Sequence, residues 1–182
     1  MKWIKRIFGT LLVLVVVLTG IAFLLPDRAE VSRSIVIAAP PERVYPYVSN
    51  FRKSNEWSPW ARYDPDTHYT FDGPDQGAGQ KMTWKSDHPQ VGSGSQEIIA
   101  AEPGRSVDVA LDMDAMGQAK ARYLLEPEGA GTKVTWGFET ELGSNPVGRY
   151  FGLMVDTFFG PDYETGLAAL KKLVEAQPDG SG

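Results

Sequence analysis

The chain has 182 residues, with 18 basic and 23 acidic side chains and a net charge of −5 at pH 7. This acidic balance argues against nucleic-acid binding, which needs a basic surface. The chain contains no cysteine, so disulfides, thiolate chemistry and zinc–cysteine sites are excluded.

Residues 1–26 differ in composition from the rest of the chain. They include a run of uncharged residues, 7–25, which follows three basic residues and precedes Asp27. As a helix this run is about 28 Å long, close to the thickness of a bilayer's hydrocarbon core. Because basic residues precede it, the sequence predicts a single-pass anchor through residues 4–25 with a cytoplasmic N-terminus. The remaining chain is then exported, to the periplasm or another extracytoplasmic space.

A cleaved signal peptide is the alternative interpretation of this segment. Gly20 and Ala22 have the spacing of small residues that a signal peptidase prefers, with a cut after Ala22. However, the apolar run continues to Leu25, further than in a typical cleaved signal. Both interpretations place the rest of the chain outside the cytoplasm.

The first elements after the anchor are a strand and two short helices. Residues 31–39 are rich in β-branched side chains, which favours a strand. Pro40 and Pro41 end this strand, and Pro41 suits the first turn of a short helix. Asn50 is a suitable cap for a second short helix.

Between residues 64 and 140 the hydrophobic pattern has a period of two. Strands are expected at residues 68–72, 79–86, 95–102, 106–113, 119–127 and 132–142. The segments between them are rich in glycine and proline, which is typical of turns. No helical pattern separates the strands, so the sequence predicts an antiparallel meander.

The C-terminal part has a helical pattern. A helix is expected from Pro146, with a break at Gly160–Pro161 and a second helix after it. The second helix has an apolar face formed by Tyr163, Leu167, Leu170 and Val174. The order of elements predicts an α+β helix-grip fold, in which a curved antiparallel sheet wraps around a long C-terminal helix.

Two segments resemble a known family. SIVIAAPPERVYPYVSNFRKSNEWSPW, residues 34–60, resembles the opening of the START-like (SRPBCC) superfamily in its polyketide cyclase/dehydrase-like branch. YFGLMVDTFFGPDYETGLAALKKLVE, residues 150–175, resembles the end of the same branch, in which membrane-tethered members occur. The resemblance implies a helix-grip domain at residues 27–176, and the composition of residues 177–182 indicates a flexible tail. The resemblance also implies a hydrophobic cavity between sheet and helix, but no particular ligand or activity.

Strand alternation gathers large apolar side chains on one face of the expected sheet. Met82 and Trp84 share a face of their strand, and Trp136 and Phe138 share a face of theirs. This pattern is compatible with a filled core as well as with a pocket wall, and the resemblance favours the wall. The expected ligand-binding residues are Trp60, Met82, Trp84, Val109, Leu111, Met113, Tyr123, Trp136, Phe138, Met154, Phe158 and Tyr163.

The two indoles in the stretch NEWSPW are expected to have different roles. Trp57 should fix the short helices to the sheet, and Trp60 should lie at the rim of the pocket. The later stretch FGLMVDTFF, residues 151–159, is apolar all around a helix. Such a helix is buried or meets a membrane or a partner.

Sequence motifs of classical catalysis are missing. The chain has two histidines in polar, turn-like segments, and neither HExxH nor GxSxG occurs. We therefore expect no metal and no cofactor. Asp156 and Glu139 lie among apolar residues, where a carboxylate can act as a general acid or base. Asp156 can equally cap a helix, pair with Arg149 or face solvent.

The sequence therefore predicts a membrane-tethered, exported domain that binds a hydrophobic small molecule or a lipid. Two alternatives remain open. One is a cyclase- or hydratase-type enzyme that uses Asp156 or Glu139. The other is an envelope stress or adaptor protein with a filled core and no ligand.

Overall fold

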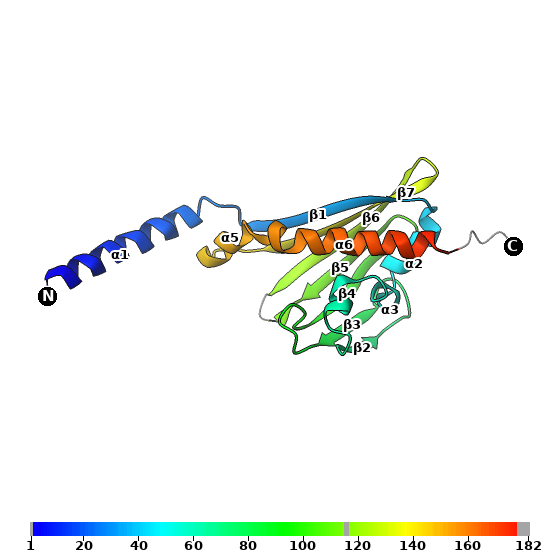
Figure 1. The fold of residues 1–182 in the computed structure, drawn as a ribbon, viewed down its shortest axis with the longest axis horizontal. Coiled ribbons are helices and arrows are strands. Elements are labelled where there is room, and N and C mark those ends of the chain that lie inside the picture. The colour runs from blue at the N-terminus through cyan, green and yellow to red at the C-terminus, as the bar shows by residue number, and fades with distance from the viewer. Residues whose placement is uncertain (1, 115–116, 178–182) are drawn as a thin grey trace.

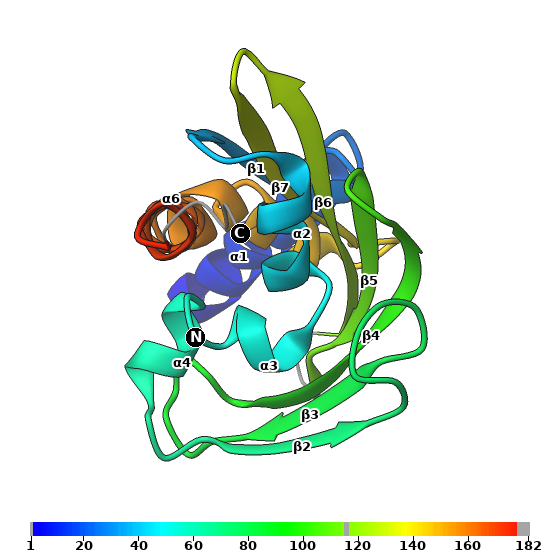
Figure 2. The same cartoon turned by 90° about the vertical axis from the view of Figure 1, so that its right-hand side faces the viewer.

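The computed structural model describes residues 2–114 and 117–177. These residues form a curved antiparallel sheet of seven strands with helices on its concave face (Figures 1 and 2). The strands are β1 (Arg28–Ile37), β2 (His68–Asp72), β3 (Lys81–Lys85), β4 (Ser93–Glu102), β5 (Ser106–Asp112), β6 (Gln118–Glu128) and β7 (Gly131–Glu141). Their order is β1-β7-β6-β5-β4-β3-β2, so β2 to β7 form a meander and β1 pairs with its end. The predicted α+β helix-grip fold is confirmed.

The alternating pattern of the sequence decides which side chains face the helices. On β7, Val134, Trp136 and Phe138 are buried, while the residues between them are half-exposed. On β4 the pairing with β5 shifts between Ile98 and Ala100, which leaves one extra residue in β4. A bulge of this kind bends its strand, and the sheet curls inward from β4 to β2 (Figure 2). The curl produces the concavity in which the helices lie.

Short helices follow β1, as predicted: α2 (Pro41–Val48) and α3 (Phe51–Ser54). Asn50 caps α3, since its side chain accepts a hydrogen bond from the backbone N–H of Arg52 at 2.9 Å. A further one-turn helix, α4 (Pro59–Tyr63), follows them and was not predicted. Pro59 occupies its first turn, where the missing N–H of proline costs nothing. This turn carries Trp60 toward the concave face of the sheet.

The C-terminal region contains α5 (Pro146–Gly152) and α6 (Val155–Glu175). The predicted break at Gly160–Pro161 is wrong, because α6 runs through both residues and the interruption lies before Val155. Gly160 gives room to the guanidinium of Arg33, which a Cβ at this position would overlap. Arg33 donates to Asp156 and to Glu164, each at 2.8 Å, and so ties the two turns that flank Pro161 to β1. This bridge stabilises the helix where proline removes one backbone hydrogen bond.

The N-terminal helix α1 (Lys2–Ala22) extends away from the domain (Figure 1). Its segment Trp3–Ala22 has a mean hydropathy of 2.1 and is long and apolar enough to span a membrane. Residues 178–182, which include nearly all of the predicted flexible tail, lie outside the described part of the chain.

Candidate ligand-binding site

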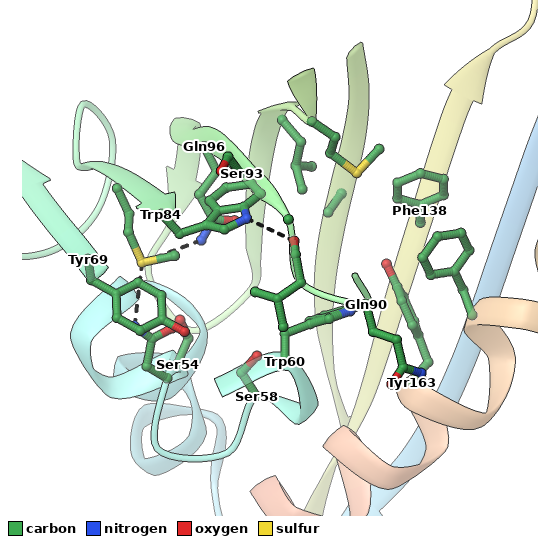
Figure 3. Close-up of a pocket in the computed structure, with 18 of the residues that line it drawn as sticks. Ser54, Ser58, Trp60, Tyr69, Trp84, Gln90, Ser93, Gln96, Phe138 and Tyr163 are labelled. Atoms are coloured by element: carbon green, nitrogen blue, oxygen red, sulfur yellow. Dashed lines mark hydrogen bonds between the residues drawn. The ribbon is translucent and has the colours of Figure 1, made fainter. Parts of the chain in front are cut away.

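A cavity of about 510 Å³ lies between the sheet, α4 and α6 (Figure 3). Its volume lies in the range of small-molecule sites in proteins. The lining residues are Ser54, Asn55, Trp57, Ser58, Trp60, Tyr69, Met82, Trp84, Pro89, Gln90, Val91, Gly92, Ser93, Gln96, Leu111, Met113, Asp114, Ala121, Tyr123, Trp136, Phe138, Phe159 and Tyr163. The sheet, α3, α4, α6 and the loop between β3 and β4 all contribute residues to this wall.

Trp136 on β7 is the centre of the aromatic part of the wall. The ring of Tyr163 stacks on it at a centroid distance of 3.9 Å. Trp57 and Trp60 meet it edge to face, at 5.2 Å and 5.7 Å. Aromatic pairs in these arrangements add about 0.5–1.5 kcal/mol each beyond burial. The cluster therefore fixes α4 and α6 relative to the sheet and makes this side of the cavity rigid.

The two indoles of NEWSPW differ in burial and in hydrogen bonding. Trp57 is 1% exposed, and its Nε1 donates to the carbonyl of Tyr47 at 2.9 Å, which ties the loop to α2. Trp60 is half-buried and contacts Tyr163 of α6 at a centroid distance of 6.1 Å. Both rings line the cavity, so Trp57 fixes the helices and also belongs to the wall.

The structure places nine of the twelve predicted ligand-binding residues at the cavity. These are Trp60, Met82, Trp84, Leu111, Met113, Tyr123, Trp136, Phe138 and Tyr163. Val109, Met154 and Phe158 do not line it. Val109 is buried in the filled core, whereas Met154 and Phe158 are half-exposed on the outside of the domain.

The inner face of the sheet is divided along the strands into a cavity half and a core half. On β5, Leu111 lines the cavity, but Val109, two residues closer to the start of the strand, is packed in the core. On β7, Phe138 lines the cavity and Val134 belongs to the core. The core half is filled by residues of α2 and α3, such as Val48. Alternation identifies the inner face but not this division, which depends on where the small helices lie.

Phe159 is a cavity residue that the sequence did not predict. It lies four residues before Tyr163 on α6, and both side chains face the cavity. Residues four apart share a helix face. The expected break at Gly160–Pro161 falls between Phe159 and Tyr163, so the sequence did not indicate that the two share a helix face. A continuous helix restores the relation and turns Phe158 outward.

Polar side chains at the cavity were also not predicted, because hydrophobic periodicity identifies only apolar positions. They include Ser54, Ser58, Ser93 and Gln96, labelled in Figure 3. Of these, Gln96 alone follows from the pattern, since it shares a strand face with the buried Ile98.

The deep polar groups are electrically neutral. Burial raises the pKa of the Tyr123 hydroxyl, and burial together with Tyr123 raises the pKa of Tyr163. Both phenols are therefore protonated at neutral pH. The indole N–H of Trp136 is buried without a hydrogen-bond acceptor among the described residues. The lining contains no lysine or arginine in the described part of the chain, and its single carboxylate, Asp114, lies on an exposed residue.

The two candidate catalytic carboxylates lie away from the cavity. Asp156 is 58% exposed at its side chain and forms an ion pair with Arg33, which lowers its pKa. Glu139 is 40% exposed and pairs with Arg28 at 3.2 Å. Neither residue lines the cavity. Among the described residues, no group of three or more histidine, aspartate or glutamate side chains is arranged to hold a metal ion.

The fold and the cavity define a helix-grip domain with an apolar internal site. The family described as polyketide cyclase / dehydrase and lipid transport matches residues 28–175. The chain belongs to this family, and the match covers the sheet and both C-terminal helices while leaving α1 outside.

Solved structures with the same fold are distant in sequence. Protein CV1439 from Chromobacterium violaceum is 21% identical with a TM-score of 0.55, over 83% of this chain and 99% of its own. Protein Ms6760 from Mycobacterium smegmatis is 16% identical with a TM-score of 0.56, over 81% and 92%. The Aha1 dimer from Colwellia psychrerythraea is 15% identical with a TM-score of 0.57, over 84% and 98%. These similarities show the fold alone. No curated protein sequence matches significantly.

Proposed function

We propose that this protein is a membrane-tethered, exported domain that binds a neutral hydrophobic small molecule or lipid in the cavity between sheet and α6. The observation that carries the proposal is the cavity of about 510 Å³, whose wall is mostly aromatic and aliphatic. Burying apolar surface of a ligand there is worth about 25 cal/mol per Å². The family description, which includes lipid transport, supports the same class of ligand.

The charge of the lining favours a neutral ligand or a neutral portion of one. An anionic head group buried among Trp136, Tyr123 and Tyr163 would meet no basic side chain among the lining residues of the described chain. A charge moved into such surroundings without a partner costs several kcal/mol. Neutral donors such as the two phenols and the side-chain amide of Gln96 can instead bind a carbonyl or hydroxyl group. We therefore expect a ligand with a large apolar body and few polar atoms.

The proposal also includes membrane tethering through α1 and export of the domain that follows it. The length and hydropathy of α1 suit a single membrane span, and the basic residues before it favour a cytoplasmic N-terminus. An anchored cavity remains close to ligands that dissolve in the bilayer. A tether thus raises the local concentration of ligand without any new contact.

The cavity also weighs on the two alternatives. An adaptor with a filled core would not contain a cavity of this size. An enzyme that uses Asp156 or Glu139 needs one of them inside the cavity, and both pair with arginines elsewhere. Ligand binding is therefore the function that the geometry supports best.

Native mass spectrometry of the full chain, extracted from its own membrane, tests the proposal. We expect the wild type to retain an additional mass of a small apolar molecule. Ala121 lines the cavity, so Ala121→Phe places a ring in the space that the ligand needs. This variant should lose the additional mass while keeping the far-ultraviolet circular dichroism of the wild type.

A matched control places the same ring on the opposite side of the sheet. Ala100 of β4 is exposed and does not line the cavity. Ala100→Phe should retain the additional mass. Absence of a bound molecule from the wild type, even after incubation with total lipid extract, would contradict the proposal.

A further inference from the structure

An apolar patch covers α5 and the start of α6, on the outside of the domain. It consists of Val147, Phe151, Leu153, Met154 and Phe158, and is called the α5 patch below. The exposed fractions of these residues range from 48% to 75%. Phe151 and Phe158 stack on each other at 5.9 Å, which joins the two helices within the patch. Exposed apolar surface gathered in this way marks an interaction site.

The α5 patch is fixed to the end of α1 by hydrogen bonds. Arg149 donates from Nη1 to the carbonyls of Phe23 and Leu25, at 3.2 Å and 3.1 Å. The hydroxyl of Tyr150 donates to the carbonyl of Leu18 at 2.8 Å. Phe23 and Leu25 follow α1, which ends at Ala22, and Leu18 lies within its last two turns, so α5 contacts both the end of the helix and the segment after it. The patch therefore lies where α1 ends, and the neighbouring Leu24 is itself 85% exposed.

The cavity lies at the same end of the sheet as α1 and α5. This end is defined by the start of β1 at Arg28, which pairs with Glu141 at the end of β7. The start of β6 and the end of β5 lie at the same end of the sheet, since Asp112 of β5 pairs with Gln118 of β6. The cavity half of the inner face is the half nearer to this end, and the core half is the more distant one.

The patch and the cavity meet at the beginning of α6. Phe158 belongs to the patch, and the next residue, Phe159, lines the cavity and stacks with Phe138 of β7 at 5.8 Å. Exposed cavity residues also lie at this end, on the loop between β3 and β4 (Pro89 and Gln90) and after β5. Solvent or lipid therefore reaches the cavity from the end that carries α1 and the patch.

We propose that the α5 patch inserts into the leaflet from which α1 emerges, as a second contact with the bilayer. The continuity of the patch with the end of the membrane-spanning segment selects lipid as its occupant. Short apolar helices bound in this way lie in the interface with their apolar side chains among the acyl chains. The contact holds the cavity entrance against the leaflet, so ligand passes between bilayer and cavity without crossing water. This consequence for exchange rests on the function proposed above.

Spin labels test the contact directly, because the chain has no native cysteine that would also be labelled. Leu153→Cys and Phe158→Cys, each in the full chain reconstituted in phosphatidylcholine liposomes, are labelled with a nitroxide. We expect both labels to be more accessible to oxygen, which concentrates in lipid, than to a water-soluble nickel chelate. The matched control is Ile99→Cys, since Ile99 is likewise apolar and 52% exposed but lies on β4. Its label should show several times more contact with nickel.

Labels at both patch positions that behave like the control would overturn the inference, and would indicate that a protein partner covers the patch. This readout requires no ligand, so it is independent of the proposed function. Lipid-exposed labels together with an empty cavity in mass spectrometry would refute ligand binding and leave the bilayer contact standing.

The consequence for exchange has its own measurement. The double substitution Leu153→Ser and Phe158→Ser should slow the loading of the full chain with a pyrene-labelled fatty alcohol from liposomes by roughly tenfold or more. Loss of apolar contact worth about 1.4 kcal/mol lowers the population of domains docked on the bilayer about tenfold, and the loading rate falls with that population. The amount bound at saturation should not change, because neither residue lines the cavity. Unchanged loading would contradict exchange through the patch, and a lower amount at saturation would contradict its separation from the cavity.

Discussion

At the scale of single residues, Trp57 and Trp60 show how position divides similar side chains. They lie three residues apart and both touch Trp136, but only Trp57 is fully buried and hydrogen-bonded through its indole. Trp57 therefore contributes to stability as much as to the wall, whereas Trp60 contributes mainly to the wall.

Alanine substitutions should separate these two contributions. We expect Trp57→Ala to lower the free energy of unfolding by about 3–5 kcal/mol, as for other large-to-small changes in a core. Trp60→Ala, at a half-buried site, should cost about 1–2 kcal/mol, because less apolar surface is lost from contact. Urea denaturation of the full chain in detergent measures both. Equal costs would contradict the division.

Arg33 and Asp156 give a residue-scale prediction for pH. Hydrogen bonds from Arg33 hold the pKa of Asp156 below its usual value, against a smaller opposing effect of desolvation. A carboxylate whose pKa is lower in the folded chain stabilises the fold above its unfolded-state pKa of about 3.9. This contribution is lost as the pH falls through the folded-state pKa.

The Tm of the wild type in detergent should therefore decrease as the pH falls from about 4 to about 2, and Asp156→Asn should reduce that decrease. The difference should be small, since the ion pair is exposed to solvent. Thermal melts over this range are the measurement. A variant that loses as much Tm as the wild type over this window would show that the pair has no influence on acid stability.

At the scale of elements, the strands and most helices could be predicted from periodicity, and the course of α6 could not. A glycine–proline pair normally ends a helix, because proline lacks an N–H and glycine is flexible. Here the guanidinium of Arg33 packs against the backbone of Gly160, and two acidic residues of α6 form ion pairs with that guanidinium. The partner of this contact is 123 residues away from Asp156 in the chain. Local sequence contains no signal of such a contact, so the continuity of α6 through Gly160 and Pro161 was not predicted.

Packing of α6 against the sheet gives the prediction for this scale. A Cβ at Gly166 would lie 3.0 Å from Cζ3 of Trp136 and 3.1 Å from Cδ of Pro59. Gly166→Val should therefore cost about 1–3 kcal/mol by overpacking. Ala168→Val is the control, at an exposed position on the same helix, and should cost about 0.5 kcal/mol through helix propensity. Similar unfolding free energies for the two variants would show that α6 can move away from the aromatic cluster at no cost.

At the scale of the whole molecule, the cavity depends on the sheet, the small helices and α6 together. The apolar inner face follows from alternation along each strand, but α2 and α3 decide which half of that face is filled. Polar lining residues such as Ser58 and Gln90 come from loops and helix ends, which show no periodic pattern. For this reason the sequence predicted most of the apolar wall and almost none of its polar part.

The proposed topology is a further property of the whole molecule. With α1 as an uncleaved anchor, the full chain should remain in the membrane fraction after alkaline carbonate extraction, and its N-terminal sequence should begin upstream of Ala22. Protease added outside spheroplasts should digest the domain that follows α1, because the basic N-terminus keeps the other end in the cytoplasm. Protection of the domain until the cells are lysed would contradict export.

The most direct test of ligand binding is a crystal structure of the full chain purified without removal of native lipid. We predict continuous non-protein density between Trp84 and Tyr163, in contact with Trp60, in the cavity half of the sheet. A cavity that holds ordered water alone, or that is closed by the side chains of Trp60 and Phe159, would contradict the account.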